Sequence, residues 1–143
     1  MIEMKRKYLP TFSELIDRLT IVTLKSVKIP KNKKEYEGEA QEIMYDLDLI
    51  IKQKKIKLTA QTIRAIAVIM FANETIWANE SKARKGEDNQ DHLLKFTHTV
   101  NGVRNNAKNL ISNEIGDRKD LKLDCLAADI CKTMGYDFGG ILK

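Results

Sequence analysis

One face of a predicted helix carries side chains that could bind a nucleotide. Residues on this face follow one another at steps of four and three, the spacing that keeps them on one side of a helix: Ile66, Met70, Asn73, Trp77, Glu80 and Arg84. The face changes from apolar to polar halfway along. An indole can stack on a purine, an arginine can pair with phosphate, and an amide can match an adenine edge. These residues predict a polar pocket that begins where the buried part of the helix ends.

A second polar stripe lies on the following predicted helix, where Thr97, Asn101, Arg104 and Lys108 step by four, three and four residues. If the two helices pack as an antiparallel hairpin across Gly86, both stripes border the same cavity. The predicted ligand-binding residues are Asn73, Trp77, Glu80, Arg84, Asn101, Arg104 and Lys108.

A purely structural interpretation of these residues is also open. Trp77 could fill the core with its N–H bonded to a neighbour, Asn73 could fix helix register, and Arg84 and Arg104 could extend into water. The position of Asn73 is the sharper indication of function, because an amide on a buried stripe must find hydrogen-bond partners.

The sequence offers little for catalysis. His92 and His98 are six residues apart and lie on different helix faces, and no His-Glu-x-x-His motif, paired-cysteine spacing or glycine-rich phosphate loop occurs. Asp120 and Asp124 share a face but have no third ligand in step with them. We therefore expect a binding protein with no catalytic residue, metal or cofactor. A nucleotide hydrolase that uses Glu80 or Asp124 is the alternative ranked last.

Helices must position the two stripes. Apolar periodicity predicts five of them, from about Glu14 to Pro30 and over residues 34–52, 60–84, 91–114 and 118–133. Thr11 or Ser13 can cap the first helix and Thr59 the third, while Gly86 and Gly116 follow the third and fourth. We predict a mainly α, single-domain bundle of about five helices over residues 1–143. A small sheet built from the terminal segments is the alternative.

Charge and composition narrow the function further. The net charge of +5 and the pI of about 9.1 favour an anionic partner. Lysines are densest over residues 31–34 and 52–57, which we interpret as solvated helix ends, with a nucleic-acid surface as the minority interpretation. No apolar run approaches the roughly 20 residues of a membrane span, and no apolar leader segment is apparent. Cys125 and Cys131 suit a reducing compartment, so we expect a cytoplasmic protein with no membrane partner.

Two stretches are similar to small phage and prophage proteins: NETIWANESKAR, from Asn73 to Arg84, and VNGVRNNAKN, from Val100 to Asn109. Over essentially its whole length the chain resembles the Thoeris anti-defence sponge family. The resemblance implies a non-enzymatic protein that sequesters the cyclic ADP-ribose isomer made by TIR-domain defence enzymes in the bacterial host's cytoplasm. It also implies a homodimer, or a higher homo-oligomer, with ligand sites between protomers.

At matching positions, the resemblance implies that Trp77 stacks on the ligand and that Arg104 and Lys108 contact its phosphates. The other predicted site residues rest on spacing alone: Asn73, Glu80, Arg84 and Asn101. Other cyclic nucleotides are further candidate ligands. The alternative function is that of a basic helical phage protein that binds nucleic acid, with an affinity that falls steeply with salt.

Overall fold

The computed structural model describes residues 7–86 and 90–118, and within these ranges the chain forms four long α-helices and no strand. The helices are α1 (Phe12–Lys28), α2 (Lys33–Lys54), α3 (Ala60–Arg84) and α4 (Gln90–Ile115), with a short 3-10 helix, η1 (Pro30–Asn32), between α1 and α2. The prediction of a mainly α protein is confirmed. The predicted helix over 118–133 and the terminal segments of the alternative sheet fall almost entirely outside the described residues.

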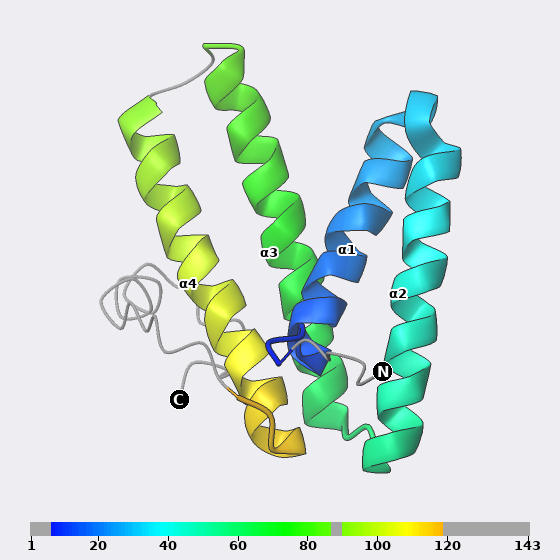
Figure 1. Cartoon of the computed structure of the whole chain (residues 1–143). Helices are drawn as coiled ribbons and strands as arrows, with labels where there is room; N and C mark the ends of the chain where they lie inside the picture. Colours follow the sequence, from blue (N-terminus) through cyan, green and yellow to red (C-terminus); the bar gives the residue numbers. More distant parts are fainter. Residues whose placement is uncertain (1–6, 87–89, 119–143) are drawn as a thin grey trace.

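The four helices form two antiparallel pairs, α1 with α2 and α3 with α4 (Figure 1). The pairs lie together at the end of the molecule where α2 is connected to α3. They diverge toward the opposite end, where α1 turns into α2 (Figure 1). Because α1 also contacts both α3 and α4, it is the element that joins the pairs.

Local capping motifs account for several helix ends. The Thr11 side chain accepts a hydrogen bond from the Glu14 backbone N–H, and the Glu14 carboxylate accepts one from the Thr11 N–H, each at 3.3 Å. This reciprocal capping box satisfies N–H groups that the helix cannot. Thr59 caps α3 by accepting from the Thr62 N–H at 3.1 Å. Gly116 follows α4 with φ +79°, a conformation that glycine adopts without steric cost.

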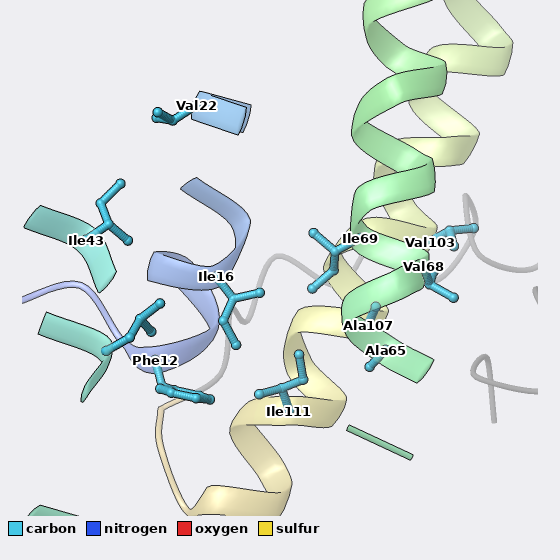
Figure 2. Packing of buried hydrophobic residues seen from close by; sticks show 11 residues of the cluster. Phe12, Ile16, Val22, Ile43, Ala65, Val68, Ile69, Val103, Ala107 and Ile111 are labelled. Atoms are coloured by element: carbon cyan, nitrogen blue, oxygen red, sulfur yellow. The ribbon is translucent and has the colours of Figure 1, made fainter. Parts of the chain in front are cut away.

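An apolar cluster fills the space where the pairs meet. Its buried members are Phe12, Ile16, Val22, Ile43, Leu47, Ala65, Val68, Ile69, Val103, Ala107 and Ile111. Ile16 of α1, Ile69 of α3 and Ile111 of α4 lie around one interior space (Figure 2). Burying each such side chain contributes about 1.5–3 kcal/mol, so this cluster is the main force that holds the pairs together.

Polar contacts fasten the start of α1 to the end of α4. The hydroxyls of Ser13 and Ser112 are 2.8 Å apart in a buried hydrogen bond. Beyond α4, the Asp117 carboxylate accepts from the Phe12 N–H at 3.3 Å and pairs with Lys54 of α2. The end of the molecule where the helix pairs meet, which we call the closed end, is therefore held by both apolar packing and hydrogen bonds.

Candidate functional site

Asn73, where the predicted stripe turns polar, is buried between three helices. Its amide nitrogen donates to Asp17 Oδ1 at 2.9 Å and to Thr20 Oγ1 at 2.6 Å, both on α1. Its amide oxygen accepts from Arg104 Nη1 of α4 at 2.8 Å. A carboxylate only accepts hydrogen bonds and a guanidinium only donates them. The amide therefore fits both partners in just one orientation, with its nitrogen toward Asp17 and its oxygen toward Arg104. Asn73 thus ties α3 to α1 and α4, and both of its amide hydrogens are engaged.

Two cations of α4 approach the same carboxylate. Arg104 Nε lies 3.9 Å from Asp17 Oδ1, and Lys108 Nζ lies 3.7 Å from Asp17 Oδ2. The exposed fractions of these side chains are 22% for Arg104, 15% for Lys108 and 12% for Asp17. We call Asp17, Thr20, Asn73, Arg104 and Lys108 the polar network. Its two cations face one carboxylate, so positive charge is in excess in a place largely shielded from water.

The cations of the polar network are not saturated by Asp17. Both ion-pair distances exceed the length of a hydrogen bond. Within the part of the chain that the structure describes, the buried Nε of Arg104 has no hydrogen-bond partner. Arg104 is instead oriented by the bond from its Nη1 to Asn73. Arg104 therefore keeps one N–H donor without an acceptor among the described residues, at an atom that is itself buried.

The α1 side of the network was missed by sequence reasoning. Ser13, Asp17, Thr20 and Leu24 step by four, three and four residues, and all four are buried. The Thr20 hydroxyl accepts from Asn73 and donates to the Asp17 backbone oxygen at 2.7 Å. Because apolar residues surround this stripe in the sequence, the α1 segment was interpreted as hydrophobic on nearly all of its faces. The steps themselves, with a carboxylate in such a helix, are the signal that could have found it.

The structure brings together three of the predicted site residues: Asn73, Arg104 and Lys108. Trp77 is partly buried and lies one turn beyond Asn73 on the same face of α3. Asn101 is partly buried and lies almost one turn before Arg104 on α4. Both residues therefore lie on the side of the polar network that faces the α3–α4 turn.

Glu80 and Arg84 lie away from the network. They are exposed on the last turns of α3, where Arg84 Nη2 is 3.6 Å from Glu80 Oε2. The contact between Asn73 and Arg104 sets the register of α3 against α4. Arg84 is eleven residues beyond Asn73, about 16 Å along the helix axis. Glu80 and Arg84 are therefore about two and three turns beyond Asn73, the residue that contacts Arg104.

The two lysine runs are also separate from the network and from each other. Residues 31–34 and 52–57 flank opposite ends of α2, a helix of 22 residues, so they lie about 33 Å apart by helical rise. The second run borders a hollow of about 470 Å³ that Glu114 also lines. Lys54 in this run pairs with Asp117. Carboxylates thus compensate part of the charge of the hollow, and the two runs do not form one basic surface.

No protein-family model, curated protein or solved structure matches the chain. The structural class of the protein is therefore defined by its fold and site. It is a protein of paired antiparallel helices with a largely buried ionic network where the pairs meet. Over residues 7–86 and 90–118, no helix has the length and apolar character needed to cross a membrane. In the same ranges, no three His, Cys, Asp or Glu side chains are grouped closely enough to hold a metal ion.

Proposed function

We propose that the protein binds a phosphate-bearing nucleotide at the polar network without converting it, and that the ligand is a cyclic ADP-ribose isomer made by TIR-domain defence enzymes. The observation that carries this proposal is the excess of positive charge at the junction of the helix pairs, where Arg104 and Lys108 flank Asp17. A phosphate there would form charge-assisted hydrogen bonds with both cations. Exclusion of water would strengthen these bonds.

Trp77 would supply the second part of the site. Its half-buried indole is one turn beyond Asn73 on the same face of α3, and stacking of a base on an aromatic side chain contributes about 1–3 kcal/mol. Asn73 acts as a positioning residue, since its amide holds Arg104 beside Asp17. Asn101, almost one turn before Arg104, would contact the ligand beside the cations. Glu80 and Arg84 lie about two and three turns beyond Asn73 and stay predictions from their spacing in the sequence.

Sequestration of a signal requires tight binding. A nanomolar dissociation constant corresponds to about −12 kcal/mol. One stacked base and two bonds to cations supply at most about 9 kcal/mol before the costs of association. We therefore include in the proposal a homodimer whose second protomer completes each site, as the resemblance to the Thoeris sponges implies. Such a protein would act in the cytoplasm of the bacterial host, where the signal is made.

Titration calorimetry with cyclic ADP-ribose isomers tests this function. Arg104→Met and Lys108→Met should each weaken binding at least about tenfold, because each removes a hydrogen bond to a charged group worth about 1.5–3 kcal/mol. The matched controls Arg18→Met and Lys95→Met remove exposed cations from α1 and α4 and should bind like the wild type. Ligand released by heat denaturation should be chromatographically unchanged.

The site, the absence of catalysis and the identity of the ligand can each be contradicted by a separate result. Wild-type affinity in both network variants would refute the site, and a chemically altered ligand would identify an enzyme. Failure of the wild type to bind any cyclic ADP-ribose isomer would refute the ligand. Binding of DNA or RNA that weakens steeply with salt and is lost when lysines of residues 52–57 are replaced would support the nucleic-acid alternative.

A further inference from the structure

A site that binds an anion is not expected to contain a carboxylate, yet Asp17 lies within the polar network. Its carboxylate lies beside Arg104 and Lys108, where it repels any phosphate that approaches them. We propose that Asp17 is the specificity-determining residue of the site, and that it makes the polar network select phosphodiesters, which carry one negative charge per phosphate, over terminal phosphate monoesters. This inference rests on the proposed anion-binding role of the network.

The contacts of Asp17 permit a phosphate to bind beside it. The only hydrogen bond that the Asp17 carboxylate accepts among the described contacts comes from neutral Asn73, at 2.9 Å. The cations stand at 3.7 and 3.9 Å, close enough for Coulomb attraction but too far for hydrogen bonds. Asp17 therefore neutralises charge without accepting a hydrogen bond from either cation. Arg104 Nε is buried and Arg104 Nη1 donates to Asn73, so a ligand oxygen would accept from the Lys108 ammonium and from the rest of the guanidinium.

Asp17 is also fastened in position. Its side chain is 12% exposed, its carboxylate is bonded to Asn73, and its backbone oxygen accepts from the Thr20 hydroxyl. Because the carboxylate is partly buried and bonded to Asn73, we expect it to stay beside the cations when a ligand binds. The bound phosphate consequently meets two cations and one anion at once.

Charge balance then distinguishes two classes of phosphate. One excess positive charge matches a phosphodiester. A terminal phosphate carries nearly two negative charges above neutral pH. Because Asp17 leaves only one excess positive charge, the second negative charge stays uncompensated in a place largely shielded from water, and its loss of hydration is not offset. Because most free nucleotides end in a terminal phosphate and a cyclic signal does not, Asp17 would keep the site from being occupied by the former.

The test compares 3′,5′-cyclic AMP with AMP at pH 8, two probes that share a base and differ in phosphate charge. Binding is followed by the fluorescence of Trp77, the only tryptophan in the chain. The wild type should bind cyclic AMP more tightly than AMP. Asp17→Asn should shift the affinity ratio toward AMP by about tenfold or more, the effect of one unit charge within 4–6 Å. The matched control Asp46→Asn, at an exposed position of α2, should leave the ratio unchanged.

A second variant guards against loss of fold. Asp17→Asn combined with Lys108→Met restores a single excess positive charge and should return the ratio to the wild-type value, with circular dichroism confirming helical content. Lys108→Met alone should move the ratio further toward cyclic AMP. An identical ratio in the wild type and both Lys108→Met proteins would overturn the inference, as would failure of every protein to bind either probe. Cyclic ADP-ribose calorimetry is independent of this ratio, so the proposed ligand can fail while the charge selection holds, and the reverse.

Discussion

Two adjacent layers of opposite chemistry lie where α1 meets α3 and α4. Nearer the end where α2 is connected to α3, Ile16, Ile69 and Ile111 pack in the apolar cluster (Figure 2). Further from that end, by one residue on α1, about one turn on α3 and about two turns on α4, Asp17, Asn73 and Arg104 occupy the same junction with hydrogen bonds and ion pairs. Apolar burial is reliably stabilising, whereas replacing a buried ion pair by apolar residues is often neutral or stabilising. We therefore expect the apolar layer to contribute more to stability than the polar layer.

The largest expected effect is in the apolar layer. Ile69→Ala should lower the free energy of unfolding by about 2–5 kcal/mol, because Ile69 is fully buried between helix pairs and its truncation leaves a cavity. Ile63→Ala is the control on the same helix. Its side chain is 58% exposed, so its loss should change stability by about 0.5 kcal/mol or less. Urea denaturation followed by circular dichroism measures both. Equal losses would mean that α3 packs through a different face.

Most of the fold could be predicted because its signals are local. The bounds of α3 follow from the Thr59 cap and from a periodicity that continues to Arg84, and they were predicted to the residue. The other described helices were predicted to within about two residues at each end. The divergence of the helix pairs has no such signal, because side-chain packing across the junction sets the angle between helices.

The residues of the candidate site also divide into those that the sequence indicates and those that depend on how the helices pack. Asn73, Arg104 and Lys108 could be found because each continues a stripe whose spacing is visible in the sequence. Asp17 was missed because its ion pairs join positions about ninety residues apart, so that only the steps of the buried stripe on α1 indicate it in the sequence. Residues on a predicted stripe can also separate in space: Arg84 shares the face of Asn73 but lies about three turns from the cations.

A smaller effect is expected from the polar layer. Asn73→Ala should lower the free energy of unfolding by about 1–3 kcal/mol, because it removes the partner of Asp17 and Arg104 and leaves buried groups unsatisfied. The same denaturation measurement on Arg104→Met and on the double variant should give a coupling energy of about 0.5–3 kcal/mol. A loss from Asn73→Ala that exceeds that of Ile69→Ala would reverse the comparison between layers. Strict additivity would show that the amide does not orient Arg104.

The smallest expected effect concerns a polar contact inside the closed end itself. Ser13 and Ser112 are 3% and 1% exposed, and their hydroxyls are bonded at 2.8 Å. Ser13→Ala or Ser112→Ala should each cost about 1 kcal/mol in unfolding free energy, since each leaves a buried hydroxyl without its partner.

The double variant Ser13→Ala with Ser112→Ala should cost less than the sum of the two single losses, because no unpaired hydroxyl of that bond remains. A fully additive loss would instead assign the Ser13 hydroxyl to its other contact, Thr11 Oγ1 at 3.3 Å. A sub-additive loss would show that the serine pair is a neutral polar contact that apolar residues can replace at small cost. The same comparison can be made in the polar layer by replacing Asp17, Arg104 and Lys108 together with apolar residues. If that variant is as stable as the wild type but no longer binds nucleotide, the charges of the polar layer serve ligand binding and not the fold.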